Sequence, residues 1–138
     1  MNPRELKQVL VSEGFQVFRV MGSEVVLADR VRDNLIMDSG VAAVCMDAFG
    51  VRIVMRAQAS DHPSSSEAEL FDFARALGKA ACEARYEETR TAVIPVPDPA
   101  DGERTLDTWY EVTYEKSGLD LARLVLELRQ ALQFRKIA

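Results

Sequence analysis

The chain has 138 residues, of which 48% are hydrophobic, and this length and composition are typical of one globular domain with its own core. Its formal net charge of -5 repels phosphate backbones and anionic membrane surfaces, so neither nucleic acid nor a membrane is expected as a partner. The sequence contains no run of about 18 apolar residues, and its N-terminus reads as an amphipathic segment rather than a signal peptide. We therefore expect a cytoplasmic protein with a single α+β domain over residues 1–138.

The first expected element is a short helix. Asn2 is a helix-capping residue, Pro3 suits the first helical position, and Glu5 stands where its side chain can reach back to the cap. An apolar face with helical spacing follows and ends at Gly14, which predicts the end of this helix.

A hairpin is expected next. The segments Phe15–Met21 and Glu24–Ala28 are rich in aromatic and β-branched residues and are separated by Gly22-Ser23, a pattern typical of two strands and a tight turn. Residues 29–39 fit either a helix ending at Gly40 or a strand, and strand is the interpretation that we favour.

Two further strands are predicted at Val41–Asp47 and Val51–Ala57, with the turn at Phe49-Gly50. The second of them alternates apolar and polar side chains, which predicts one dry face and one partly wet face.

A central helix is expected over Glu67–Ala84, after the polar loop 60–66, because Ser66 and Glu69 form a capping-box pattern. Its apolar residues recur at helical spacing and are mostly small, as suits close packing on a sheet. These residues are Leu70, Ala74, Leu77, Ala81 and Ala84.

The last part of the chain predicts two strands and a helix. Thr89–Val96 reads as a strand, and after the loop 97–103 an alternating run from Leu106 to Tyr114 reads as its hairpin partner. A strongly amphipathic helix begins near Ser117 to Asp120. The order is helix, three to five strands, helix, two strands and helix, which indicates an α+β fold with an antiparallel sheet flanked by three helices.

This pattern resembles a family of small acidic bacterial proteins, those with the type III secretion chaperone-like fold, including the YbjN family of proposed regulators. The resemblance is architectural and rests on the element order, on Asn2–Gly14 followed by Phe15–Met21, on the helix Glu67–Ala84 and on the closing helix. It implies a homodimer without enzymatic activity that binds an extended or partly unfolded protein segment. No binding residue can be carried over, because no short motif defines these proteins.

Few residues of the chain could carry catalysis. His62 is the only histidine and has Asp61 and Ser64 beside it, but adjacent loop residues seldom form a triad, and the order reads better as a turn before a helix. Cys45 and Cys82 lie 37 positions apart in apolar surroundings, so we expect both to be small buried hydrophobic residues. No catalytic residue is therefore assigned.

Cofactor and metal sites are not expected either. The acidic residues Asp98, Asp101, Glu103 and Asp107 lack the ligand register of a calcium loop and read as a solvated turn. The glycines stand singly, without a phosphate-binding run.

Several apolar residues raise the question of a binding surface. Met21, Met37, Met46 and Met55 lie on or beside strands, and we expect them to fill gaps in the core, with a permissive binding surface as the alternative. Trp109 and Tyr110 lie on opposite faces of one strand, so one ring is expected in the core and the other at an interface.

The closing helix has more apolar residues than one sheet face would bury, which predicts a second apolar surface and a homodimer. The function hypothesis is a dimeric, non-enzymatic protein-binding module that acts as an adaptor, chaperone or regulator. The alternative is a small-molecule binder or enzyme whose pocket lies between the sheet and the central helix, where Arg52, Arg56 and Tyr110 could orient an anion. The candidate interface residues are Leu121, Val125, Leu128, Leu132 and Trp109.

Overall fold

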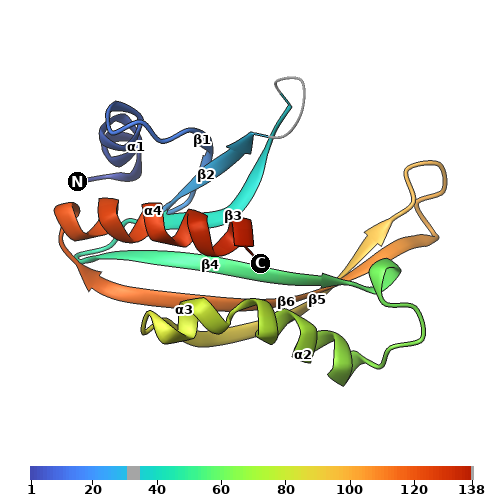
Figure 1. The fold of residues 1–138 in the computed structure, drawn as a ribbon. Coiled ribbons are helices and arrows are strands. Elements are labelled where there is room, and N and C mark those ends of the chain that lie inside the picture. Colours follow the sequence, from blue (N-terminus) through green and yellow to red (C-terminus); the bar gives the residue numbers. More distant parts are fainter. Residues whose placement is uncertain (31–34, 138) are drawn as a thin grey trace. The chain divides into compact units, whose positions relative to one another are not determined.

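The computed structural model describes residues 1–30 and 35–137, and within these ranges it has six strands and four α-helices (Figure 1). The sheet order is β1-β2-β3-β4-β6-β5 and the sheet is antiparallel, so the expected α+β class is confirmed. The elements are α1 (Pro3–Ser12), β1 (Val17–Met21), β2 (Glu24–Arg30), β3 (Ile36–Val44), β4 (Phe49–Gln58), the 3-10 turn η1 (Ala59–Asp61), α2 (Glu67–Leu77), α3 (Lys79–Glu83), β5 (Glu87–Pro97), β6 (Thr105–Leu119) and α4 (Leu121–Ile137).

The chain forms two compact units. The first contains residues 1–53 and 115–138, and the second contains residues 54–114. Strands β4 and β6 cross the boundary, so the chain enters and leaves the second unit within strands. The expectation of one domain over residues 1–138 stays a prediction.

In the first unit, α1 begins as the sequence indicates. The Asn2 side chain accepts a hydrogen bond from the Glu5 backbone N–H at 2.8 Å, and Pro3 is the first helical residue. Gly14 has a φ of +96°, a left-handed conformation that glycine adopts without strain, and it turns the chain into the segment before β1.

Of the described residues in the segment 29–39, all but Leu35 belong to strands. Asp29 and Arg30 end β2, and Ile36 begins β3, while residues 31–34 lie outside the described part of the chain. Gly40 is not a helix cap but a residue within β3 at φ +79°. The strand pairing is irregular beside it, since Val26 pairs with Ala42 while Ala28 pairs with Asp38.

The turn expected at Phe49-Gly50 is wrong, because β3 ends at Val44 and both glycine and phenylalanine belong to β4. Gly50 pairs with Val44, and a Cβ atom on Gly50 would lie 3.0 Å from the carbonyl oxygen of Lys116. Glycine is therefore needed here for the close approach of β6 rather than for a turn.

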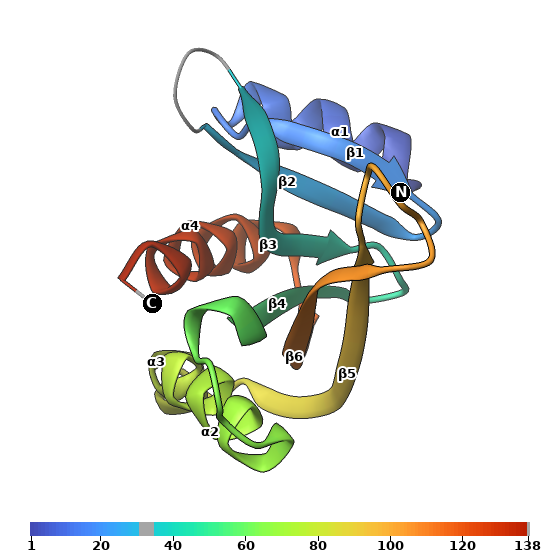
Figure 2. The same cartoon turned by 90° about the vertical axis from the view of Figure 1, so that its right-hand side faces the viewer.

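The core of the first unit lies between its strands and the helices α1 and α4, and α4 runs along β3 (Figure 2). The pairs Val41 with Ile53 and Ala43 with Val51 place four fully buried side chains on one face of β3 and β4. Fully buried residues of the two helices complete this core: Leu6, Leu10, Leu124, Leu128 and Ala131.

In the second unit, the capping box of α2 is confirmed. The Ser66 hydroxyl accepts from the Glu69 N–H, and the Glu69 carboxylate accepts from the Ser66 N–H. The single helix expected over Glu67–Ala84 is wrong, because it divides at Gly78 into α2 and α3. A Cβ atom on Gly78 would overlap the buried ring of Tyr114, so glycine at this position lets the helical segment approach β6.

The same ring predicts an alkaline pH dependence. Burial raises the pKa of Tyr114 to about 12 from an ordinary value of 10.0, because removal from water disfavours the phenolate, and the charges of Cys82 and Glu88 add to the effect. A raised folded-state pKa stabilises the protein fully below pH 10, and this stabilisation is lost as the pH rises from 10 towards 12.

We expect the free energy of unfolding to fall less steeply in this range in Tyr114→Phe than in the wild type. Urea denaturation at about pH 9 and about pH 11 measures the two slopes, and titration of the other ionisable groups is common to both proteins. Equal slopes would show that the phenol of Tyr114 does not carry the dependence.

Candidate functional site

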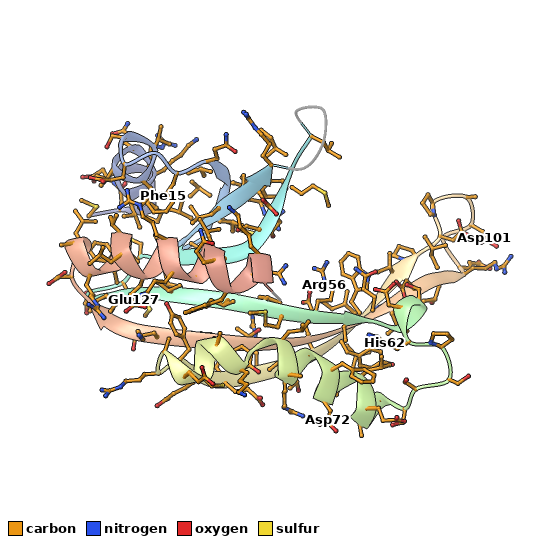
Figure 3. The ribbon with its side chains drawn as sticks, in the orientation of Figure 1. Phe15, Arg56, His62, Asp72, Asp101 and Glu127 are labelled. Carbon is orange, nitrogen blue, oxygen red and sulfur yellow. The ribbon has the colours of Figure 1, made fainter. Side chains whose placement is uncertain are left out.

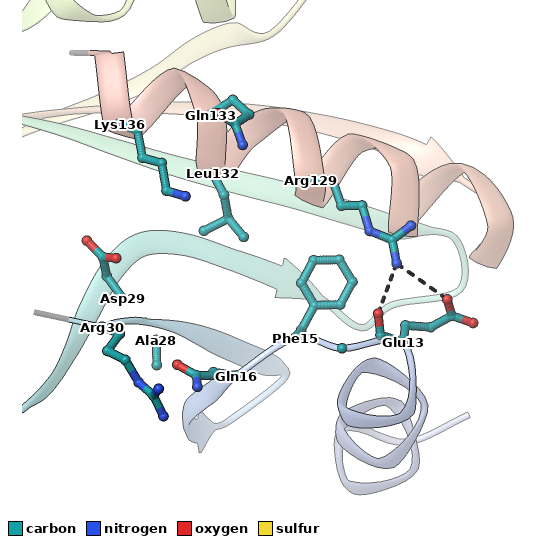
Figure 4. A pocket seen from close by; sticks show the side chains of 11 residues that line it. Glu13, Phe15, Gln16, Ala28, Asp29, Arg30, Arg129, Leu132, Gln133 and Lys136 are labelled. Carbon is teal, nitrogen blue, oxygen red and sulfur yellow. Dashed lines mark hydrogen bonds and ion pairs between the residues drawn. The ribbon is translucent and has the colours of Figure 1, made fainter. Parts of the chain in front are cut away.

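A groove lies in the first unit between α4, the segment that precedes β1 and the end of β2 (Figure 4). Its cavity volume is about 490 Å³. We call it the α4 groove and define it by its lining residues: Glu13, Gly14, Phe15, Gln16, Ala28, Asp29, Arg30, Arg129, Leu132, Gln133 and Lys136.

The apolar part of the groove is formed by Phe15, Ala28 and Leu132. The backbone N–H of Phe15 donates to the carbonyl of Leu10 at 3.0 Å, which ties the phenylalanine to the end of α1. The Ala28 N–H donates to the carbonyl of Gln16 at 2.8 Å, which joins the two backbone segments that form the wall opposite α4. Phe15 is almost fully buried, whereas Leu132 is partly open to the groove.

One side of α4 forms the other wall. Arg129, Leu132, Gln133 and Lys136 are spaced at i, i+3, i+4 and i+7, so they share one face of the helix. The guanidinium of Arg129 donates to the Glu13 carbonyl at 2.9 Å, lies 3.5 Å from the Glu13 carboxylate, and has its central carbon 5.3 Å from the centre of the Phe15 ring. The end of α1 and the middle of α4 are thereby joined across the groove.

The C-terminal end of α4 is held by Arg135. Its Nε donates to the carbonyl of Ser39 at 2.9 Å, and the guanidinium covers Gly40, where a Cβ atom would lie 2.6 Å from Nε. Any larger residue at position 40 would have to displace this contact and would also be strained at φ +79°.

The first half of α4 is held by a buried carboxylate. Glu127 is only 1% exposed, and its Oε1 lies 3.1 Å from the Lys116 ammonium of β6 and 3.1 Å from the Arg123 guanidinium one turn earlier. Asp120 caps the helix by accepting from the Arg123 N–H at 2.8 Å.

The charges of the groove are of both signs and unevenly paired. Arg129 and Glu13 form an ion pair, whereas Arg30, Lys136 and Asp29 make none within the described ranges. Three cationic side chains thus stand against two carboxylates, in a chain whose net charge is negative.

The polar side chains that line the groove are two carboxylates, two amides, two guanidinium groups and one ammonium group. Its lining has no histidine, cysteine or serine that could serve as a nucleophile or general base at neutral pH. In the described part of the chain, no group of three or more His, Cys, Asp or Glu side chains is arranged to hold a metal ion.

The single histidine lies in the second unit (Figure 3). The ring of His62 stacks on Phe73 of α2, with 4.3 Å between ring centres and 22° between planes. Asp61 ends the η1 turn, and Ser64 has a φ of 71° in the loop that leads to α2. These residues have the turn and helix-entry setting that the sequence indicates.

The cysteines differ from one another. Cys45 is buried and its thiol donates to the carbonyl of Met1 at 3.0 Å, as expected of a small core residue. Cys82 is exposed, so the expectation that it is buried is wrong. It follows Ala81, which is fully buried, and the next residue of a helix points about 100° away.

The acidic loop is held by its own backbone. The Asp98 and Asp101 carboxylates accept from the backbone N–H groups of Ala100 and Glu103, and Asp107 accepts from the Ser60 backbone and hydroxyl. The hydrogen bonds from Ser60 lower the pKa of Asp107. The first two contacts are those of a turn, and the contacts of Asp107 connect β6 with η1.

The arginines proposed as anion ligands are engaged by glutamates. In the first unit Arg52 pairs with Glu24 and lies 3.6 Å from Glu115. In the second unit Arg56 pairs with Glu111 at 2.9 Å and lies over the Trp109 ring at 3.7 Å. Tyr110 makes an edge contact with Phe71 of α2. Both arginines are thus already paired with carboxylates, and an anion site formed by the three residues stays a prediction.

Most of the methionines are not in the core. Met55 is fully buried, but Met21, Met37 and Met46 are 51%, 48% and 68% exposed, so the interpretation that all four fill core gaps is wrong. Met21 ends an edge strand, Met37 is near the start of β3, and Met46 follows its end. Their exposure reopens the alternative of a binding surface.

The candidate interface residues differ in their exposure. Val125 and Leu128 are buried within the first unit, Leu132 lines the α4 groove, and Leu121 and Trp109 are half-buried. Part of the apolar surface of α4 that predicted a homodimer is covered by β3, which packs along the helix.

Sequence reasoning missed the groove. None of its residues except Leu132 was among the candidate site residues, and Phe15 was expected only as the start of a strand. The available signal was the i, i+3, i+4, i+7 stripe on the last helix, which has two cations and a leucine on a face of its own.

No family model, curated protein or solved structure matched the chain in the three comparisons that were made. Over the residues described, no helix combines the length and the hydropathy needed to cross a membrane.

The anchor of α4 gives a stability prediction. Glu127→Ala removes an ion-pair partner of the mostly buried Lys116 ammonium, so we expect the free energy of unfolding to fall by about 3 kcal/mol. Arg123→Ala removes a 60% exposed partner and should cost less than about 1 kcal/mol. Urea denaturation followed by circular dichroism measures both, and equal losses would contradict the anchoring role of Glu127.

Proposed function

We propose that this chain is a non-enzymatic protein-binding module, an adaptor, chaperone or regulator, that holds a segment of a partner protein in the α4 groove. The observation that carries the proposal is the groove itself, with an apolar centre at Phe15 and Leu132 between charged rims. Apolar centres with polar rims are the usual anatomy of protein recognition sites.

Exposed apolar side chains beside the groove support a peptide as the occupant. Met37 pairs with Asp29 and Ile36 pairs with Arg30 across β2 and β3, and both apolar side chains are 48% exposed. They leave apolar surface on the two faces at the start of β3, beside residues that line the groove. A partner segment longer than the cavity would cover them, whereas a small molecule would leave them in water.

Peptide selection tests this function. A displayed library of random peptides selected on the wild type should give binders that fail on Leu132→Asp, because a charge at the apolar centre repels the anchor side chain. The matched control is Leu126→Asp, since Leu126 is 55% exposed on α4 but does not line the groove.

Circular dichroism spectra of both variants serve as the control that each variant is folded. Peptides that bind Leu132→Asp as tightly as the wild type, or a selection that enriches no peptide, would contradict the proposal.

A homodimer remains part of the proposal, with a different surface from the one expected on α4. In the second unit, the β5–β6 hairpin carries Val93, Ile94 and Leu106, which are 46%, 37% and 62% exposed. Adjacent strand residues point to opposite faces, so Val93 and Ile94 leave apolar surface on both sides of this arm. Its tip projects away from α2 (Figure 1). A second copy could cover the arm through a two-fold contact.

The mass of the protein in solution tests whether it forms a dimer. Light scattering during size exclusion should give the mass of two chains for the wild type and of one chain for Leu106→Asp. Thr105→Asp is the control, because Thr105 is the neighbouring exposed residue of β6 and adds the same charge. A monomeric wild type would contradict dimerisation and would leave the proposal that the groove binds a partner segment unchanged.

A small-molecule binder is the second candidate. The volume of about 490 Å³ lies within the usual range for ligand pockets, roughly 300–1,000 Å³. This site is in the first unit, whereas the central helix beside which the sequence placed a pocket belongs to the second unit. A fragment library that stabilises the wild type but not Leu132→Asp against heat would favour this candidate.

A further inference from the structure

The charges of the α4 groove carry information about the partner. Arg129, Lys136 and Arg30 are cationic, whereas Glu13 and Asp29 are the acidic residues of the lining. Glu13 is already occupied by Arg129, so the charges without an ion pair in the described chain are two cations and one carboxylate. The groove is a locally cationic place on an acidic protein, and it favours an anionic occupant.

The two cations of α4 are far apart. Arg129 and Lys136 are seven positions apart, which places their backbones about 10 Å apart along the helix axis. Two carboxylates at a similar separation would each pair with one of these cations. An extended or polyproline-II chain covers this distance in about three residues.

Arg129 is fixed in place before any partner arrives. Its Nη2 is bonded to the Glu13 carbonyl, and Phe15 packs against the guanidinium, while about half of the side chain remains exposed. A guanidinium has five N–H donors, so a carboxylate can still bind to it. Little side-chain entropy is lost when it does.

The apolar centre lies between these two cations. Leu132 is three positions after Arg129 and four before Lys136, and it stands opposite Phe15 and Ala28 (Figure 4). An occupant that satisfies the groove therefore has an apolar side chain flanked by negative charges.

Resting on the proposed protein-binding function, we propose that the partner segment is acidic, with a central apolar anchor on Leu132 and Phe15 and carboxylates about three residues apart that pair with Arg129 and Lys136. Arg30, on the opposite wall, adds a third positive charge at the Lys136 end of the groove. The segment is recognised by this charge and anchor pattern.

Fluorescence anisotropy with three labelled synthetic peptides tests the inference on the full chain. The peptides share one length and a central leucine and differ only in two flanking residues three positions apart, which are glutamate, glutamine or lysine. We expect the glutamate peptide to bind about tenfold more tightly than the glutamine peptide, because two exposed ion pairs are worth about that factor. The lysine peptide should bind most weakly, and added salt should reduce the preference.

Variants of the groove test which cations cause the preference for the glutamate peptide. Lys136→Ala and Arg30→Ala should each weaken binding of the glutamate peptide about threefold and leave the glutamine peptide unchanged, whereas Lys79→Ala, an exposed lysine of the second unit, should change neither. Binding that is equal for the three peptides but lost in Leu132→Asp overturns the acidic partner and leaves the protein-binding function standing. Failure of all three peptides to bind overturns both.

Discussion

The ion pair of Glu127 with Lys116 joins α4 to β6, and the described first unit depends on it. A carboxylate that is 1% exposed is costly unless a cation stays beside it, so the helix can rotate or slide very little against the strand. Leu124, Leu128 and Ala131 then face inward together and are fully buried. The polar contact sets the position of the helix, and apolar burial supplies most of its stability.

Two further contacts extend this constraint along α4. Arg129 reaches the end of α1 at Glu13, and Arg135 reaches the Ser39 carbonyl beside Gly40. Arg129 lies in the middle of the helix and Arg135 near its C-terminal end, so α4 is held at three points along its length. Leu132 and Lys136 lie on the same half of the helix and form part of one wall of the groove. The position of the groove is therefore a consequence of how the helix is fixed.

Local signals in the sequence identified the elements well where a short segment decides the outcome. The Asn2 cap and the Ser66 capping box are formed as expected, because each needs only residues within one turn. The glycines were less informative. Gly50 lies within β4, and Gly78 separates α2 from α3. Both glycines admit a residue of β6, Lys116 and Tyr114 respectively, and the identity of such a neighbour cannot be read from the sequence near the glycine.

By itself, the sequence determined the α+β class, the element order and the alternation of β4, because hydrophobic periodicity and capping depend on neighbours along the chain. Only the tertiary structure decided that Leu128 is internal, that Cys82 and three methionines are exposed, and that Glu13, Phe15 and Arg129 meet at one groove. The physical reason is that burial and charge pairing depend on which surfaces meet across 116 positions of chain, as Glu13 and Arg129 do.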